Sequence, residues 1–324
     1  MPFNSREHIA RLGNPAHFEY EDVSCYLCGA QECAEFLVGE DDLTGKDGRF
    51  LYVKCGGCGL VYQNPRLPVH RIKEFYDSEY IAHRKKKDWG PLTPLYNRAM
   101  NKHDRDKEKL VSRYVKLGPE TEVFDVGCAV GTFLLYLNDR HGCRIGGLDF
   151  KEDLNYPGFD RIDFYQGLFY EAPVPRGRYD LVTMWHFLEH CYDPERSLRT
   201  ASEVLKDDGT LIIEVPRLDS LTFRLFGEKW PGVQAPQHTA LYTRETFCRM
   251  IEKNGFRIEH YLPYGAFPPY FYIFTGAYFK TVGKGLNLDR IVAPYFAGQL
   301  LLTPVLLGQK FLNLSMQTAV CRKI

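Results

Sequence analysis

The chain has 324 residues, of which 44% are hydrophobic and 25% are charged, as in an ordinary globular protein with a sizeable core. Its 41 basic and 41 acidic residues cancel, which disfavours a nucleic-acid partner, because such partners usually bind a basic domain. The dense basic run at residues 83–87 is short and typical of a solvated helix face. No apolar stretch follows the first charges, so we expect no secretory signal, a cytoplasmic location and reduced cysteines.

Two copies of Cys-x-x-Cys-Gly occur in the N-terminal region, which we assign to residues 1–65 as a zinc-ribbon module. Each copy can place two thiolates on one zinc ion, and the following glycine permits the left-handed turn of such knuckles. A redox dithiol is the rival interpretation, but two matched pairs favour one closed, structural site that folds the module without catalysing. Its four ligands would be Cys25, Cys28, Cys55 and Cys58. A strand is expected at residues 50–53, and Cys33 falls outside the spacing.

Residues 66–117 predict a helical connector that carries scattered aromatic side chains. These side chains either pack between the neighbouring domains or form an aromatic wall or lid over a substrate. They are Tyr76, Tyr80, Trp89, Tyr96 and Tyr114.

From residue 118 to residue 265, strands and helices alternate, which predicts a mostly parallel, doubly wound α/β sheet. The first strand is expected at residues 123–126, the helix after its loop at 132–139, and the second strand at 144–148. This order places the connecting loops at the carboxyl edge of the sheet, where doubly wound folds bind their ligands.

The loop after the first strand differs from a dinucleotide-binding loop, because Gly127, Ala129 and Thr132 stand where that pattern has three glycines. Asp125 would bring negative charge toward a pyrophosphate, but it suits a ligand with a positively charged amino end. Asp149, about 20 residues past the loop, is placed to accept hydrogen bonds from ribose hydroxyls. S-adenosylmethionine has such an amino end, a ribose and an adenine.

Residues 125–131, Asp-x-Gly-x-Ala-x-Gly, resemble motif I of the class I S-adenosylmethionine-dependent methyltransferases, with alanine replacing the commoner middle glycine. Residues 178–190 are similar to that family's fourth strand and its Leu-Glu-His segment, and residues 202–215 to its next helix, glycine turn and fifth strand. The resemblance covers roughly residues 118–262 and implies a Rossmann-like methyltransferase sheet and methyl transfer.

The same resemblance implies a role for each matching position. The loop backbone and Asp125 would hold the methionine portion, Asp149 the ribose, and Phe150 would lie against adenine unless it is a core residue. The turn at residues 166–168 would meet the adenine amino group through a backbone carbonyl, since Leu168 stands where many relatives have an acid. The expected cofactor-binding set is Asp125, Gly127, Cys128, Ala129, Gly131, Asp149, Phe150, Gly167, Leu168 and Trp185.

A narrower resemblance involves residues 55–65, 75–80 and 226–243. These segments are similar to zinc-ribbon methyltransferases of bacterial polysaccharide, glycolipid and natural-product pathways, among them sugar C-methyltransferases. The resemblance implies methyl transfer to oxygen or carbon of a small or lipid-linked acceptor, with sugar-type molecules favoured. The alternatives are an RNA methyltransferase and a non-catalytic, cofactor-binding scaffold.

A hydroxyl or carbon acid must lose a proton on methylation, and histidine, with an ordinary pKa of about 6.5, is suited to accept it. The candidates are His186 and His190, after the fourth strand, and His238, after the fifth. The sequence His-x-x-Glu-His also matches an inverted zinc-protease pattern, but it lies where the methyltransferase segment belongs. Some relatives that methylate quinone precursors bind a divalent cation on Glu-x-x-Glu-His. A cation at His186, Glu189 and His190 is therefore an alternative, as are hydrogen bonds that brace the loop.

Two uncharged stretches, residues 261–279 and 291–309, are as long as a membrane-spanning helix, but both contain prolines. We prefer a hydrophobic helical cap, residues 266–324, that shapes the substrate pocket. Spanning helices and peripheral contact of residues 261–309 with the inner membrane face or a lipid-linked acceptor are the alternatives. Residues 316–324 alternate like an edge strand and should return to the sheet.

Overall fold

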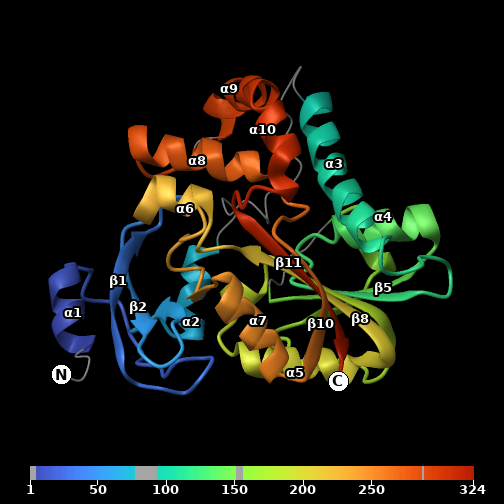
Figure 1. Cartoon of the computed structure of the whole chain (residues 1–324), viewed down its shortest axis with the longest axis horizontal. Helices are drawn as coiled ribbons and strands as arrows, with labels where there is room; N and C mark the ends of the chain where they lie inside the picture. Colours follow the sequence, from blue (N-terminus) through green and yellow to red (C-terminus); the bar gives the residue numbers. More distant parts are fainter. Residues whose placement is uncertain (1–4, 77–92, 151–155, 287) are drawn as a thin grey trace.

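The computed structural model describes residues 5–76, 93–150, 156–286 and 288–324 (Figure 1). Its larger sheet has five neighbouring parallel strands, and beyond them one strand runs in the opposite direction before a last strand that runs parallel to the five, which confirms the predicted doubly wound α/β fold. In spatial order the strands are β10 (Phe256–Leu262), β11 (Met316–Lys323), β8 (Leu205–Pro216), β7 (Tyr179–Trp185), β4 (Glu122–Val126), β5 (Arg144–Asp149) and β6 (Asp163–Gln166).

The central strands of this sheet are buried on both faces, as their continuous apolar sequences predict. On one face, β4 and β7 pack against α3 (Thr93–Val111) and α4 (Thr132–His141). On the other face, they pack against α5 (Pro194–Val204) and α7 (Arg244–Lys253), which Figure 1 shows across the sheet from α4. The two layers of helices leave the carboxyl ends of the parallel strands free to carry a site.

The strand β11 returns to the sheet, but the prediction of an edge strand there is wrong. It pairs with β8 on one side and with β10 on the other, and residues 316–321 are buried. The polar residues of this strand are buried, and they form hydrogen bonds inside the protein. Gln317 accepts one from the Tyr261 hydroxyl, and Thr318 donates one to Tyr264 O. The polar residues of β11 therefore suggested contact with solvent, but their hydrogen-bond partners are groups of the protein itself.

The smaller sheet is antiparallel and has the order β1 (Cys33–Glu40), β2 (Arg49–Cys55), β3 (Val61–Gln63) and β9 (Ala240–Leu241). The helix α1 (Ser5–Leu12) lies beside it. Its last strand comes from a region that the sequence assigns to the larger domain. Leu27, Leu51 and Tyr62 share one buried cluster with residues of α5 and α7. The N-terminal module is thus continuous with the main core, and the predicted domain limits stay predictions.

In its described residues, the predicted connector contains α2 (Val69–Ile72), η1 (Lys73–Phe75) and then α3. The basic run at residues 83–87, together with Tyr80 and Trp89, lies outside the described residues. Two further 3₁₀ turns, η4 (Phe159–Arg161) and η5 (Leu188–His190), occur in the loops of the larger sheet.

A layer of short helices lies over one end of both sheets (Figure 1). It contains α6 (Leu221–Phe226), η6 (Gly227–Lys229), α8 (Pro269–Thr281), α9 (Leu288–Leu301), α10 (Thr303–Leu307) and η7 (Gly308–Lys310). The prolines divide the apolar stretches, since α8 begins at a proline and α10 has one in its first turn. In the described part of the chain, no helix has the length and apolar character needed to cross a membrane.

Candidate functional site

A cavity of about 1360 Å³ opens at the carboxyl ends of β4, β5 and β7, under the helical layer. Pockets for a single small ligand usually measure about 300–1,000 Å³, so this cavity has room for two ligands side by side. All three candidate histidines line it, and so does every expected cofactor position except Gly131. The four cysteines do not line it; they lie in the N-terminal module.

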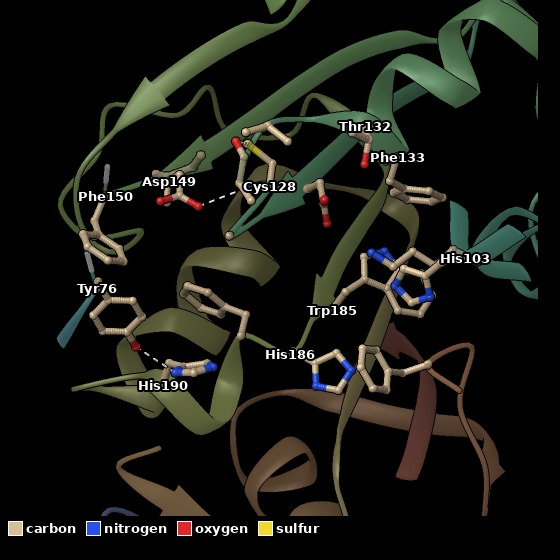
Figure 2. A pocket seen from close by; sticks show the side chains of 18 of the residues that line it. Tyr76, His103, Cys128, Thr132, Phe133, Asp149, Phe150, Trp185, His186 and His190 are labelled. Atoms are coloured by element: carbon tan, nitrogen blue, oxygen red, sulfur yellow. Dashed lines mark hydrogen bonds between the residues drawn. The ribbon is translucent and has the colours of Figure 1, made fainter. Parts of the chain in front are cut away.

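The loop after β4 needs its glycines for two reasons. Gly127 and Gly131 have positive φ angles of 76° and 73°, and a Cβ on Gly131 would lie 2.3 Å from Ile162 Cδ1. Ala129 also has a positive φ, 48°, and its amide donates a 2.9 Å hydrogen bond to Asp149 Oδ2 (Figure 2). This bond ties the loop to the end of β5.

Three carboxylates gather beside this loop. Asp125 is 4% exposed and accepts a 2.6 Å hydrogen bond from the Thr183 hydroxyl. Burial raises the pKa of Asp125 to about 6; Asp104 and Asp149 add to the effect, while Lys107 and Thr183 oppose it. Because these buried negative charges repel one another, the cluster favours a ligand with a positive charge and disfavours a phosphate.

Asp104 and Lys107 are site residues that the sequence reasoning missed. Both lie on α3 and line the cavity, and Lys107 Nζ stands 5.3 Å from the ring centre of Trp185. The Nε1 atom of Trp185 is buried and has no hydrogen-bond partner among the described residues. No sequence signal pointed to α3, because it precedes the recognisable motifs and reaches the site only through the fold.

The expected adenine side of the cavity is formed by Phe150, Gly167 and Leu168. The ring of Phe150 is partly buried and meets the ring of Tyr76 edge-on, with centres 4.9 Å apart (Figure 2). Gly167 donates its amide to Asp149 O, which fixes the turn after β6 against the end of β5.

The side chain of His186 lies between two buried carboxylates. Its Nδ1 is 3.2 Å from Glu189 Oε1, and its Nε2 is 3.6 Å from Glu214 Oε1. Burial lowers the pKa of His186, but the two carboxylates outweigh burial and raise it to about 9. Glu214 also accepts hydrogen bonds from the amides of Ala266 and Phe267, which lead into α8. His186 with its two carboxylates therefore connects the loop after β7 with β8. Through the hydrogen bonds to Glu214, the same contacts reach the start of the helical layer.

The other two histidines are held through backbone carbonyls. His190 Nδ1 lies 3.0 Å from Gln237 O and 2.8 Å from the Tyr76 hydroxyl, and His238 Nδ1 lies 2.8 Å from Gly232 O. Because a carbonyl oxygen can only accept, each Nδ1 donates, and the free lone pair of each ring is on Nε2. Burial lowers the pKa of both histidines, that of His238 most strongly, so both are neutral at pH 7.

The N-terminal sheet holds the backbone of His238. The Tyr52 hydroxyl and Gln63 Nε2 both donate to His238 O, at 2.7 Å and 2.6 Å. The same Gln63 amide donates to Pro236 O at 2.8 Å. The sequence predicted His238 as a candidate but gave no sign of these contacts, which join residues more than 170 positions apart.

The four cysteines of the two Cys-x-x-Cys-Gly copies come together, and their sulfur atoms all lie within 4.8 Å of one another. The Cys25 and Cys58 sulfurs are 3.4 Å apart, and those of Cys28 and Cys55 are 3.5 Å apart. Burial raises the pKa of Cys25 and that of Cys58, the latter to about 11. Three of these cysteines are buried and Cys28 is exposed, and four thiols at these separations have the donor set of a tetrahedral zinc site.

Comparison with known proteins identifies the family of the chain. A family model described as "Methyltransferase domain" matches residues 95–261, just over half of the chain. The sarcosine/dimethylglycine N-methyltransferase of Halorhodospira halochloris is 32% identical over 35% of this chain and 43% of that protein. A probable S-adenosylmethionine-dependent methyltransferase of Mycolicibacterium smegmatis is 26% identical over 43% of this chain and 52% of its own length. The chain thus spans about half or less of these relatives.

Among solved structures, the chain is similar to geranyl diphosphate C-methyltransferase from Streptomyces coelicolor A3(2), with 13% identity and a TM-score of 0.46. The alignment covers 67% of this chain and 78% of that one.

The doubly wound sheet and its glycine loop define the class as a Rossmann-like methyltransferase. The chain belongs to the methyltransferase domain family, in agreement with its resemblance to the class I S-adenosylmethionine-dependent methyltransferases.

Proposed function

We propose that the chain methylates an oxygen or carbon atom of a small or lipid-linked acceptor, with sugar-type molecules favoured. The observation that carries this proposal is the pair of neutral imidazoles, His190 and His238, in the same cavity as the motif I loop. A hydroxyl or carbon acid must lose a proton to become a nucleophile, and these imidazoles are suited to accept it. S-adenosylmethionine, when bound, supplies the electrophilic methyl group.

The residues at the strand ends fit this cofactor. The carboxylates of Asp104 and Asp125 favour its amino end, and the unpartnered Nε1 of Trp185 can donate to its carboxylate. Asp149 is available for the ribose, and Phe150 is available for the adenine. The predicted cofactor set is thereby retained, and we add Asp104 and Lys107 to it.

We assign different roles to the three candidate histidines. His238 and His190 present Nε2 lone pairs and serve as proton acceptors. His186 is protonated at pH 7 between its two carboxylates, so it cannot accept a further proton and instead positions the loop.

The acceptor side of the cavity is mainly aromatic and apolar. Aromatic faces stack on the C–H faces of a sugar ring as well as on an apolar tail. The aromatic residues there are Tyr76, Phe267, Phe271, Tyr272, Tyr295 and Phe296.

A second candidate function is N-methylation of a small amine, favoured by the names of the N-methyltransferases to which the chain is similar. A neutral amine attacks without losing a proton first, so it would not need the His190 and His238 pair. The two candidates therefore differ in how strongly activity depends on these histidines.

We also propose that the four cysteines bind one structural zinc ion. Their knuckle glycines, Gly29 and Gly59, have positive φ angles of 76° and 77°, and the Gly57 amide donates to Cys55 Sγ. Four protein ligands leave no open coordination position, so this ion would stabilise the module without catalysing.

For the cellular setting, we propose a cytoplasmic protein that contacts the inner membrane face peripherally. Apolar side chains of α9, α10 and the following turn are exposed: Leu300 by 76%, Leu301 by 80%, Leu307 by 77% and Phe311 by 90%. Flotation with lipid vesicles tests this part: the wild type should float and a Leu301→Gln/Phe311→Gln variant should not. A wild type that stays at the bottom of the gradient refutes membrane contact.

The main proposal is tested with methyl-labelled cofactor and a panel of nucleotide-linked sugars, lipid-linked sugars and amines. Mass spectrometry should find label on oxygen or carbon of a sugar-type acceptor, and His238→Gln should lose that label while adenosylhomocysteine binding persists. Label on nitrogen that survives in His238→Gln would support the second candidate instead. Label on no acceptor from a native cell extract would support a non-catalytic scaffold.

A further inference from the structure

Glu189, His190 and His238 meet at one point beside the cavity. Each offers one possible ligand atom, and the three atoms lie within 4.8 Å of one another. Glu189 and His190 come from η5, after β7, whereas His238 comes from the loop before β9. Hydrogen bonds from the Thr239 amide and hydroxyl to Glu189 O hold the two loops together.

One carboxylate oxygen in this group has no partner. Glu189 is 1% exposed; its Oε1 faces His186, but its Oε2 is buried without a hydrogen-bond partner among the described residues. An unsatisfied buried carboxylate oxygen is costly, and a cation would remove that cost.

The two imidazoles are oriented as metal ligands usually are. Metal-bound histidines commonly donate their second ring nitrogen to a carbonyl or carboxylate, which fixes the ring and leaves the other nitrogen for the metal. Here Gln237 O and Gly232 O engage Nδ1 of His190 and His238, so Nε2 is the ligand atom on both. Their rings are nearly perpendicular, at 82°, with centres 4.4 Å apart.

We infer that Glu189, His190 and His238 form a binding site for a divalent first-row transition-metal ion. Two imidazoles and one carboxylate suit Zn²⁺, Fe²⁺ or Mn²⁺, whereas Mg²⁺ and Ca²⁺ prefer oxygen ligands alone. The site differs from the one suggested by the sequence, because both ring nitrogens of His186 face carboxylates, Glu189 and Glu214.

Three protein ligands leave at least one coordination position open. His190 and His238 line the cavity, so that position would face the acceptor. An oxygen of the acceptor bound there would become more acidic, as water does on such ions. With a metal ion bound, His190 and His238 would hold it through Nε2 and would no longer accept the proton, which would pass from the metal-bound oxygen to solvent. This step rests on the proposed function, whereas the metal site itself does not.

The test counts bound zinc. Purified full-length protein is saturated with Zn²⁺, desalted and measured by mass spectrometry for metal per chain. We expect two zinc ions in the wild type, one held by the cysteines, and one in Glu189→Gln. The variant should bind the second ion at least roughly 100-fold more weakly, because even the loss of an outer-shell partner costs 10–100-fold. His103→Gln, which alters a different histidine of the same cavity, should retain two.

A second variant, His190→Gln, carries the test if Glu189→Gln fails to fold, as judged by thermal unfolding. One zinc ion in the saturated wild type, or two in a folded Glu189→Gln or His190→Gln variant, overturns the inference. Calorimetry with adenosylhomocysteine is run separately on the wild type. A chain that binds two zinc ions but no adenosylhomocysteine would refute the proposed function and leave the metal site standing.

Discussion

The two halves of the cavity are built in different ways. The cofactor half comes from consecutive strand ends, β4, β5 and β7, with their loops. The acceptor half is assembled from segments far apart in the chain: Tyr76, the loop that carries His238, and the helices α8 and α9. A contiguous motif can therefore specify the cofactor half, whereas the acceptor half depends on how the N-terminal module and the helical layer pack on the sheet.

Removal of a cysteine from the N-terminal module should have the largest effect on the acceptor half. Structural zinc in small domains is worth about 10–16 kcal/mol, so Cys58→Ser should lower the melting temperature of the chain more than any other change considered. Methyl transfer should also fall, because the module holds the backbone of His238. Differential scanning calorimetry and zinc content check this result, with Cys33→Ser as the control. Equal melting temperatures for the two variants would contradict it.

The sequence could specify the proposed cofactor half because its determinants are local. Asp125, the glycines of the loop and Asp149 fall within one strand–loop–helix–strand unit, so their spacing is readable. Asp104 and Lys107 were missed because α3 reaches the same point only through tertiary packing. In the acceptor half, the sequence indicated the three histidines as candidates from their residue type and their position after the strands. Their different electrostatic roles depend on carboxylates and carbonyls that are distant in sequence, such as Glu214 beside His186.

The His186 ion pair gives a pH dependence of stability. Its pKa is about 9 in the folded chain and about 6.5 when unfolded, so its stabilisation is complete below about pH 6.5 and lost as pH rises through 9. The loss should reach about 3 kcal/mol by order of magnitude. Urea unfolding at pH 7 and pH 10 measures it. Because Glu214 is one of the two partners, Glu214→Gln should show a smaller loss across the same range; an unchanged slope would contradict this assignment.

A substitution at Asp149 in the cofactor half should chiefly weaken cofactor binding. Asp149→Ala removes the acceptor for the Ala129 amide and the proposed ribose ligand. We expect adenosylhomocysteine to bind about 10–100-fold more weakly, as for the loss of a charged hydrogen-bond partner worth about 1.5–3 kcal/mol. Calorimetry measures the dissociation constant, and Asp139→Asn is the control. Unaltered binding in Asp149→Ala would remove this residue from the cofactor site.

The smallest expected effect tests whether the N-terminal sheet influences methyl transfer by positioning His238. Tyr52→Phe removes one of two hydrogen bonds to His238 O and leaves that of Gln63, so the loop should shift only slightly. A bond of this kind contributes about 1 kcal/mol, and we expect kcat to fall about five- to tenfold with adenosylhomocysteine affinity unchanged. Tyr242→Phe is the matched control, because its buried hydroxyl has no hydrogen-bond partner among the described residues. If both variants lose activity equally, simple packing accounts for the effect; a loss confined to Tyr52→Phe means that the module positions His238 for the reaction.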